Sequence, residues 1–497
     1  MTEITPVLDP FALATELSNK LLIDGALVPA RSGATFDVIN PATGKVIAQA
    51  AEGDAADVDA AVESCKAAQK SWARMKARDR GKLIIECGRR LQAHVEELGR
   101  LTALETGKAL RTESRVEASV LADAFIYYGG LASELTGETI PFSPEMLTVT
   151  VREPIGIVGA IIPWNAPLLL MALKIAPALV AGNAIIVKSA EEAPLGVLRV
   201  AQVMHEVLPP GVFNLLSGDG PGCGAPLASH PAIGKITFTG SVETGRIVYR
   251  AAAEKLVPAT LELGGKSPMI VMGDADLDRA VAGAISGMRF TRQGQSCTAA
   301  SRMFVHESLH DVFVERLCAA VNAMKMGDPL DEATDIGTII SPRQFETVQR
   351  YIQLGKEVNG AVANECSELP TDPALADGLF VKPVIFTDMP DEARPAREEI
   401  FGPVTCVFRF KEYEEVIARA NDSEFGLGAT IWTRDLRTAM DAVHRLEAGF
   451  VQVNQNLVVQ PTLSYGGVKA SGIGKEASLA AMLDHFTHKK TIIINMT

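Results

Sequence analysis

Cysteine motifs and an excess of positive charge are both missing from this chain of 497 residues. Its seven cysteines are scattered, with no Cys-x-x-Cys pair and no Cys/His cluster, so neither a disulfide framework nor a metal site is expected. Unpaired cysteines are typical of a reducing compartment, which indicates a cytoplasmic protein. The formal net charge of −13 disfavours nucleic acid and anionic membrane surfaces as partners.

A long apolar run is missing as well. The stretch 155–182 comes nearest to one, but five residues that a membrane span would not tolerate interrupt it: Pro163, Asn165, Pro167, Lys174 and Pro177. No run of about 18 apolar residues survives, so we predict a buried strand, a loop and a buried helix there. The first 24 residues hold several acids and no uninterrupted apolar segment, so no signal peptide is expected.

The chain does have a sustained alternation of short apolar runs and helical periodicity, which starts near residue 155. Strands are predicted at 155–162, 184–188, 212–216, 236–239, 269–272, 302–306, 380–386, 404–410, 428–432 and 449–454. Helices are predicted at 168–181, 195–207, 224–229, 242–254, 277–290, 310–324, 342–354, 413–421 and 436–446. Repeated strand–helix units predict parallel sheets with helices on both faces, so the fold class is α/β with two or three domains.

The segments outside this alternation have other patterns. Short strands are predicted at 22–28 and 36–50, and helices at 54–75, 79–106 and 114–129. Two extended runs, 133–140 and 147–153, predict a β-hairpin arm. The tail 489–495 predicts a solitary apolar strand, which would invite pairing with another strand edge or another chain.

Polar and glycine-rich segments follow four of the predicted strands. They are Pro163-Trp-Asn165, Lys188-Ser-Ala-Glu191, 218–224 and Thr239-Gly-Ser241. Ligands of open parallel sheets bind beyond the carboxyl ends of the strands, so these segments are expected to converge on one ligand site. Gly472-Ile-Gly-Lys-Glu-Ala477 formally fits a dinucleotide-binding fingerprint, but no strand closely precedes it and we treat it as a false match.

Cys297 is the candidate nucleophile. It follows a Gly-centred bend at Gly294 and precedes a stretch of small residues, so backbone N–H groups could approach the thiol and an oxyanion beside it. Such surroundings are expected to lower the thiol pKa, since thiolate is favoured near helix starts and cations. The alternative is an inert buried cysteine.

Four further candidates each have a plain alternative. Glu262, beside two glycines, is either a general base or a solvated loop acid. The Asn165 amide either donates to an oxyanion or stabilises a turn. Ser241 opens a helix that could bind phosphate, or it is an ordinary N-cap. Lys188 and Glu191 either bind ribose hydroxyls or form a solvated pair.

Taken together, seven motifs resemble those of the aldehyde dehydrogenase superfamily of NAD(P)-dependent enzymes and occur in its order. They are Pro-Trp-Asn165, Lys188-x-x-Glu191, Phe-Thr-Gly-Ser241, Glu262-Leu-Gly-Gly, Gly-Gln-Ser-Cys297, Glu399-Ile-Phe401-Gly-Pro and Gly466-Gly-x-Lys-x-Ser-Gly472. The resemblance runs from about Leu22 to Ile494. It implies oxidation of an aldehyde to the acid through a thiohemiacetal and a thioester on Cys297, with NAD as hydride acceptor.

The resemblance also assigns roles to residues. Cys297, Glu262 and Asn165 would be nucleophile, base and oxyanion donor, and Lys174 with Glu476 would form either a proton relay or a structural ion pair. The implied cofactor contacts are Ile161, Ile162, Pro163, Trp164, Lys188, Glu191, Gly220, Gly224, Gly240, Ser241, Leu263, Glu399 and Phe401. The implied substrate contacts are Ala166, Leu169, Leu170, Thr291, Ser296, Val458, Val459 and Tyr465.

The same likeness implies three structural parts and an oligomer. An NAD-binding domain would comprise 1–132 and 154–263, and a catalytic domain 264–480, both Rossmann-like. The hairpin 133–153 and the tail 481–497 would form an oligomerisation region, in a homodimer or homotetramer.

Departures from the family pattern suggest the specificity. Ser189 stands where proline is frequent, with little expected consequence. Glu191 would repel a 2′-phosphate and so favours NAD over NADP. Ala166 replaces a frequent aromatic residue, which predicts room for a medium or bulky, apolar or aromatic aldehyde. Arg292 either meets a substrate carboxylate or, as we expect, points outward at the surface.

Three other functions remain open at this level. A CoA-acylating semialdehyde dehydrogenase would pass the thioester to a thiol, but the presence of Glu262 argues against it. A non-catalytic protein with the same fold would not need Cys297, Glu262 and Asn165 together. A thioesterase without redox chemistry would not need Lys188 and Glu191.

Overall fold

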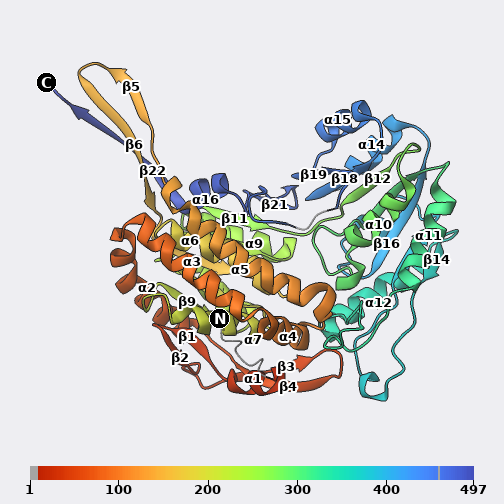
Figure 1. Ribbon diagram of the computed structural model, residues 1–497, viewed down its shortest axis with the longest axis horizontal. Helices are drawn as coiled ribbons and strands as arrows, with labels where there is room; N and C mark the ends of the chain where they lie inside the picture. Colours follow the sequence, from red (N-terminus) through yellow and green to blue (C-terminus); the bar gives the residue numbers. More distant parts are fainter. Residues whose placement is uncertain (1–8, 457–458) are drawn as a thin grey trace, which may run out of the picture.

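The computed structural model describes residues 9–456 and 459–497. Two α/β halves, each built on a central sheet, lie side by side, and a long arm projects from one of them (Figure 1). The mixed α/β fold predicted from the alternation is confirmed.

Helices and short strands precede the first sheet. They are α1 (Pro10–Glu16), β3 (Thr35–Asn40), β4 (Lys45–Ala51), α2 (Ala55–Arg74), α3 (Ala77–Ala93), α4 (Val95–Thr106), a π-helical turn (Leu110–Ser114) and α5 (Arg115–Gly130). The prediction of one helix over 79–106 is wrong, because His94 leaves the helical conformation between α3 and α4. The apolar spacing continues across the break, so periodicity does not reveal it. Gly81 and Gly88 let α3 pack directly on the backbone of α5.

The first sheet has the strand order β2-β1-β9-β8-β7-β10-β11-β21. Its strands are β1 (Leu21–Ile23), β2 (Ala26–Val28), β7 (Ile157–Ile161), β8 (Ala184–Lys188), β9 (Phe213–Leu216), β10 (Lys235–Thr239), β11 (Ala259–Glu262) and β21 (Gly472–Ile473). Strands β7 to β11 are parallel, and the connecting helices are α6 (Pro167–Val180), α7 (Leu195–His205), α8 (Ala225–Ser229) and α9 (Val242–Glu254). The strand order reverses between β7 and β10, so a ligand crevice is expected at their carboxyl ends.

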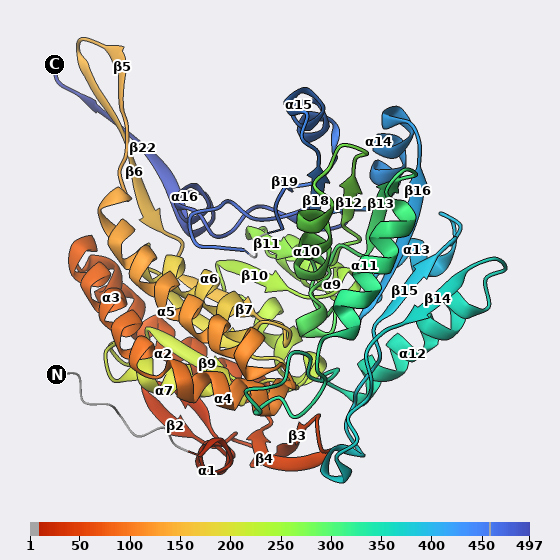
Figure 2. The same cartoon turned by 45° about the vertical axis from the view of Figure 1, so that its right-hand side comes forward.

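The second sheet has the strand order β14-β15-β16-β13-β12-β18-β19. The strands are β12 (Pro268–Val271), β13 (Arg302–His306), β14 (Val362–Glu365), β15 (Val384–Thr387), β16 (Val404–Phe410), β18 (Gly428–Trp432) and β19 (Phe450–Val453). The helices are α10 (Leu277–Met288), α11 (His310–Asn322), α12 (Pro342–Lys356), α13 (Arg394–Arg397), α14 (Tyr413–Asn421) and α15 (Leu436–Arg445). Figure 2 shows α10 and α11 side by side in front of this sheet.

Short strands are where sequence and structure differ most. Pattern analysis did not predict β11, β14 and β21, which are too short for a periodic signal. Strand β15 begins at Val384 and not at Phe380, directly after Pro383, which has no N–H for a ladder hydrogen bond. A two-stranded pair, β17 (Phe425–Gly426) with β20 (Val468–Lys469), was also not predicted.

The arm is a three-stranded antiparallel sheet of β5 (Thr139–Ser143), β6 (Met146–Pro154) and β22 (Thr487–Asn495), which follows α16 (Leu479–Phe486). The first arm strand begins later than predicted, because Leu131–Glu134 form a 3-10 turn that continues α5. The tail strand is not solitary: it pairs with β6 along its whole length, from Thr487 opposite Pro154 to Asn495 opposite Met146. The arm projects from the body (Figure 1).

Over residues 9–456 and 459–497, no helix combines the length and apolar character that a bilayer span requires. The His, Cys, Asp and Glu side chains of these residues form no group of three that could hold a metal ion.

Candidate functional site

The Cys297 loop connects the short turn after α10 with β13. Gln293 and Gly294 both have positive φ, and a Cβ at Gly294 would collide with the carbonyl of Gly402, so only glycine fits this position. The buried Gln295 side chain anchors the loop through two hydrogen bonds. Its amide nitrogen donates to the Thr338 carbonyl at 3.2 Å, and its amide oxygen accepts from the Ile340 N–H at 3.1 Å. The loop is therefore held in one shape by side-chain to backbone hydrogen bonds.

Asn165 lies against this loop. It follows β7 and is buried, and its side-chain nitrogen donates to the Gln295 carbonyl at 3.2 Å. Its own carbonyl accepts from the Lys108 ammonium at 3.1 Å. The first predicted convergence, of residues 165 and 297, is thus present, although the two are 132 positions apart in the chain.

The two glycines after Glu262 bring three segments together. A Cβ on Gly264 would collide with the Glu399 carboxylate, and one on Gly265 would collide with the Cys297 carbonyl. The Gly265 N–H donates to Glu399 at 2.9 Å. Both glycines are therefore required by close packing, and they place Glu399 beside the backbone of Cys297.

Glu262 is the last residue of β11, between Thr239 of β10 and Gly472 of β21. The solvated loop acid of the alternative interpretation is excluded, because the side chain is buried and neither carboxylate oxygen has a hydrogen-bond partner in the structure. Burial raises the pKa of this carboxyl well above its usual value, and the nearby Glu476 raises it further. A buried carboxyl without partners is suited to taking up and releasing a proton.

The Cys297 thiol lies 3.3 Å from the Tyr465 hydroxyl. The prediction of a lowered thiol pKa is wrong for this structure, since burial raises the pKa of Cys297 to about 11. The Tyr465 hydrogen bond lowers the thiol pKa, while the charges of Glu399 and Glu262 raise it. The Arg292 charge also lowers it, but burial is the largest influence, so the pKa of the Cys297 thiol lies above its usual value.

Lys174 and Glu476 form a buried ion pair. The Lys174 ammonium lies 2.7 Å from the Glu476 carboxylate, which also accepts from the Thr237 hydroxyl at 3.0 Å. The second Glu476 oxygen is buried without a partner. Both charges influence the pKa of Glu262, so the pair lies beside that carboxyl.

Arg292 contradicts the expectation of an outward surface arginine. It is buried, and its guanidinium donates twice to Glu113, at 2.8 and 2.6 Å. The Thr291 hydroxyl donates to the other Glu113 oxygen. Sequence reasoning failed here because the partner lies 179 positions earlier in the chain, on the π-helical turn before α5.

Three further residues of the site have no sequence motif and were missed. The Glu117 carboxylate accepts from the N–H groups of Leu168 and Leu169 at 2.8 and 3.2 Å, and so caps the start of α6. Lys108 forms a buried ion pair with Glu117. With Glu113, these residues anchor Asn165 and the Cys297 loop. Lys108 lies in a loop, Glu113 in the π-helical turn and Glu117 in α5, so no local sequence pattern could have identified them.

The predicted cofactor residues lie along the carboxyl edge of the first sheet. Ile161, Ile162 and Pro163 continue β7, and Trp164 packs edge-on against Phe401 with ring centroids 5.2 Å apart. Lys188 ends β8 and lies 3.3 Å from Glu191. Gly240 and Ser241 follow β10, and the Ser241 hydroxyl caps α9. Leu263 follows β11, Glu399 and Phe401 lie beyond Gly264, and Gly220 and Gly224 bound a turn after β9.

Five of the eight predicted substrate residues are buried in one extensive hydrophobic core. They are Ala166, Leu169, Leu170, Val459 and Tyr465, and Cys297 packs against the same core. Ser296 precedes the thiol and its hydroxyl contacts the Thr298 hydroxyl at 3.1 Å, while Thr291 is bound to Glu113. Val458 lies outside the described residues.

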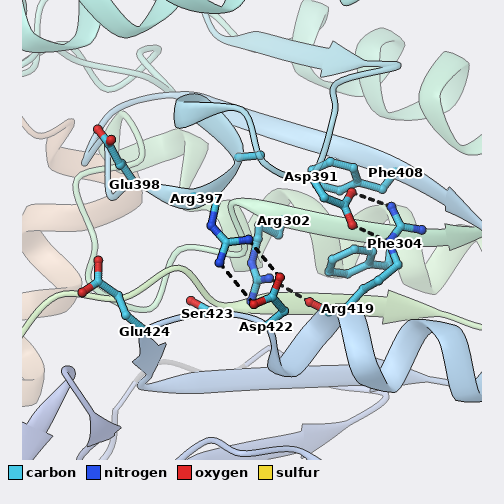
Figure 3. Close-up of a pocket in the computed structure, with 11 residues that line it drawn as sticks. Arg302, Phe304, Asp391, Arg397, Glu398, Phe408, Arg419, Asp422, Ser423 and Glu424 are labelled. Atoms are coloured by element: carbon cyan, nitrogen blue, oxygen red, sulfur yellow. Dashed lines mark hydrogen bonds and ion pairs between the residues drawn. The ribbon is translucent and has the colours of Figure 1, made fainter.

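A separate cavity of about 270 Å³ opens beside β13 and β16, with Arg302, Arg397 and Arg419 in its wall (Figure 3). Each of the three guanidinium groups is hydrogen-bonded within the protein. Arg397 binds Asp422 at 2.9 and 3.2 Å, Arg419 binds Asp391 at 2.6 and 2.7 Å, and Arg302 donates to three backbone carbonyls. This cavity does not include Cys297.

Comparison with known proteins agrees with this geometry. The model of the aldehyde dehydrogenase family matches residues 27–492. A hydroxyisobutyraldehyde dehydrogenase of Mycolicibacterium austroafricanum is 41% identical over 477 residues, 96% of this chain and 94% of that protein. A phenylacetaldehyde dehydrogenase of Pseudomonas fluorescens is 40% identical over 488 residues, 96% of each chain. The NAD+ complex of an aldehyde dehydrogenase from Bacillus cereus superposes with a TM-score of 0.94 at 39% identity, over 99% of both chains.

Proposed function

The chain belongs to the aldehyde dehydrogenase family and oxidises aldehydes to carboxylic acids with NAD, and from this premise we propose that Cys297 is its nucleophile and Glu262 its general base. One observation carries the proposal. The Tyr465 hydroxyl lies 3.3 Å from the Cys297 sulfur, and the next residue, Gly466, packs against a partner-free carboxylate oxygen of Glu262. The Asn165 amide donates to Gln295, two positions before Cys297. Candidate nucleophile, base and amide donor therefore belong to one buried site.

The proposed reaction begins with the neutral thiol. Deprotonated Glu262 takes the proton of Cys297, and the sulfur attacks the aldehyde carbonyl carbon to form a thiohemiacetal. The carbonyl oxygen gains the electron pair and receives hydrogen bonds from the Asn165 amide and the Cys297 N–H. Within the described part of the chain, that N–H donates to no protein acceptor, so it is free for this role.

The chemistry that NAD would supply when bound is acceptance of a hydride from the thiohemiacetal carbon, whose loss leaves a thioester on Cys297. Glu262 releases the proton that it took from Cys297, and the Lys174–Glu476 pair offers a route for that proton away from the site. The deprotonated Glu262 then takes a proton from water, which attacks the thioester carbon. The acid departs, and Glu262 returns its proton to the thiolate, which restores the neutral thiol.

The carboxyl edge of the first sheet, along which the predicted cofactor residues lie, is suited to binding a dinucleotide. The hydroxyls of Ser189 and Thr239, which lie at the ends of β8 and β10, are buried without hydrogen-bond partners in the structure. We assign the adenosine ribose to Lys188 and Glu191, the pyrophosphate to Ser241 at the start of α9, and the nicotinamide ribose and ring to Glu399 and Phe401. The remaining contacts are those predicted along 161–164 and at 220, 224, 240 and 263.

NAD is proposed over NADP. The Glu191 carboxylate is 43% exposed at the end of β8 and would face a 2′-phosphate with like charge. Replacing Glu191 with Ser should lower KM for NADP while leaving that for NAD within a few-fold. An unchanged NADP KM would contradict the assignment.

The substrate is proposed to be a medium or bulky uncharged aldehyde, aromatic or branched. The Ala166, Leu169, Leu170, Val459 and Tyr465 cluster is apolar, and Arg292 is bound to Glu113 and so is not free to receive a substrate carboxylate. The relatives named for phenylacetaldehyde and hydroxyisobutyraldehyde support this class. An NADH-absorbance screen over aliphatic, aromatic, branched and carboxylated aldehydes tests it: a preference for the carboxylated members would overturn it.

Hydrolysis, not transfer to coenzyme A, is proposed for the second step. Glu262 is buried beside the thiol, where it can activate water. Product analysis with and without coenzyme A decides the question, because an acylating enzyme would form acyl-CoA at the expense of free acid.

We also propose the domain division 1–132 with 154–263, 264–480, and 133–153 with 481–497, the last as the oligomerisation region of a cytoplasmic homodimer or homotetramer. The arm supports this, since it exposes several apolar side chains: Ile140, Phe142, Leu147, Ile493, Ile494 and Met496. Both outer edges of its sheet, β5 and β22, have one strand neighbour only. Light scattering of the protein and of a Phe142→Asp, Ile493→Asp variant should show a loss of assembly in the variant.

A further inference from the structure

Two cysteines that play no part in the site lie together at the outer side of the second sheet. Cys318 is on α11, and Cys366 follows directly after β14. Both belong to the same hydrophobic cluster, in which Cys366 is buried and Cys318 is partly exposed. In Figure 1, α11 and β14 lie next to each other at the edge of the molecule, away from the arm.

Hydrogen bonds hold the end of β14, where Cys366 lies, against α11, which carries Cys318. Ser367, the neighbour of Cys366, donates its hydroxyl to the Val321 carbonyl and its N–H to the Asn322 side chain, both at 2.6 Å. Val321 and Asn322 lie three and four positions after Cys318, on the same face of α11. These contacts hold Cys366 against the face of α11 that carries Cys318, and both thiols pack in the same cluster.

The two thiols differ in their surroundings. The interaction with Cys366 lowers the pKa of Cys318, whereas the pKa of Cys366 is raised. Burial raises the pKa of Cys297 to about 11, so Cys318 is more readily ionised than Cys297. A partly exposed thiol that ionises readily, with a second thiol beside it, is the arrangement that peroxides convert to a disulfide.

We propose that Cys318 and Cys366 are a redox modification site, at which a hydroperoxide forms a reversible disulfide between α11 and the end of β14. The Cys318 thiolate attacks one oxygen of hydrogen peroxide, the O–O bond breaks, and one water leaves after protonation. The resulting sulfenic acid is attacked by the Cys366 sulfur, the S–O bond breaks, and a second water leaves. Both sulfurs are oxidised by one electron each, and the peroxide is reduced to two waters.

The other cysteines do not share this arrangement. Burial raises the pKa of Cys65, Cys87 and Cys223 to about 12 and that of Cys406 to about 11. Cys65 accepts a hydrogen bond from the Asn214 side chain, and Cys406 donates one to the Pro395 carbonyl. The disulfide would close a loop over the 47 residues between positions 318 and 366, which restricts the unfolded chain and raises the thermal stability of the oxidised form.

Peptide mapping of the full-length enzyme tests the proposal. The reduced protein is treated with increasing hydrogen peroxide, quenched with N-ethylmaleimide and digested with trypsin without reduction. A linked species of peptide 317–325 with the peptide that begins at Glu357 should reach more than half of the material while the peptide 293–302, with Cys297, is still unoxidised. Dithiothreitol should release both peptides, and the melting temperature should rise on oxidation and fall back on reduction.

Variants separate this site from the active site. Cys318→Ser should lose the linked species and the rise in melting temperature, and in its reduced form should retain the parent kcat and KM. Cys406→Ser, a buried cysteine of the same sheet without a thiol neighbour, should retain both effects. Oxidation of Cys297 before any linked species appears would overturn the proposal. Peptide mapping of the parent protein alone can detect this outcome, so the test does not depend on whether a variant folds.

Discussion

Two groups of buried charges border the Cys297 loop, and they differ in how completely the charges are paired. The first, here the paired cluster, consists of Lys108, Glu113, Glu117 and Arg292. The second, the Glu262 cluster, consists of Lys174, Glu262 and Glu476. Both groups lie within the protein interior, and each contacts a different part of the site.

In the paired cluster every charge has a partner. Arg292 donates twice to Glu113, and Lys108 binds Glu117. Burial opposes the charged form of Glu113, but Arg292, the Thr291 hydrogen bond and the nearby Arg289 together outweigh burial and lower the pKa of that carboxyl. The remaining donors and acceptors reach the backbone of Asn165 and the start of α6, so this cluster positions the oxyanion donor.

In the Glu262 cluster, one carboxyl group has no partner. Lys174 pairs with Glu476 at 2.7 Å, and Glu262 has no hydrogen-bond partner at either oxygen. Its pKa is therefore raised, while that of Glu113 is lowered, although both carboxyls are buried. Burial alone therefore does not decide whether a carboxyl is protonated. A buried carboxylate with a charged partner stabilises the structure, whereas a buried carboxyl without a partner can exchange a proton.

The largest expected effect comes from removing the thiol that both clusters surround. Cys297→Ala should lower kcat for aldehyde oxidation by about 10⁴-fold or more, because no other group can form the thioester. Fluorescence titration should show NAD binding within a few-fold of the parent. Loss of NAD binding instead would mean that residue 297 supports the cofactor site.

The next effect separates the Glu262 cluster from the paired one. Glu262→Gln should lower steady-state turnover by roughly 10²–10⁴-fold, because this carboxylate both takes the thiol proton and activates the water that hydrolyses the thioester. A burst of NADH that approaches the enzyme concentration should remain but form more slowly than in the parent, as the thioester accumulates. A base works deprotonated, so parent turnover should rise with pH through the raised pKa of Glu262 and then level off. The variant should lack this rise, and undiminished turnover would refute the role.

Breaking the paired cluster should act on stability first. Arg292→Met leaves Glu113 buried without its partner and should lower the free energy of unfolding by about 3–5 kcal/mol. The double variant Arg292→Met, Glu113→Gln should recover part of that loss, because no uncompensated charge remains. Denaturant unfolding measures both, and additive losses in the double variant would show that the two residues do not interact.

The smallest effect concerns the hydrogen bond to the thiol. Tyr465→Phe removes the hydroxyl 3.3 Å from the Cys297 sulfur, and with it an interaction that lowers the thiol pKa. Iodoacetamide should then alkylate Cys297 about 2–10-fold more slowly at fixed pH, as expected for a hydrogen bond of about 0.5–1.5 kcal/mol. Equal alkylation rates would show that the hydroxyl does not affect the thiolate population.

Much of the fold could be predicted from local pattern. Strands 302–306, 404–410 and 428–432 and helices 242–254 and 413–421 have the predicted bounds, because the strands are apolar runs and the helices have a clear helical period. The break at His94 was not predictable, because the helical spacing of apolar residues continues across it. Strand β21 was not predictable either, because two residues cannot show the alternation of a strand. Of the site, Cys297, Glu262 and Asn165 could be singled out by their glycine, proline and small-residue neighbours.

The sequence by itself determined the alternation that makes two parallel sheets and the motifs that end their strands, because both follow from side-chain chemistry and spacing along the chain. Only the tertiary structure decided that Arg292 is buried on Glu113, that Glu262 has no partner, and that Cys318 meets Cys366. Those outcomes depend on which distant side chain arrives at each position, and on how much water is excluded there. Both the pairing and the pKa of a buried group are set by that three-dimensional environment.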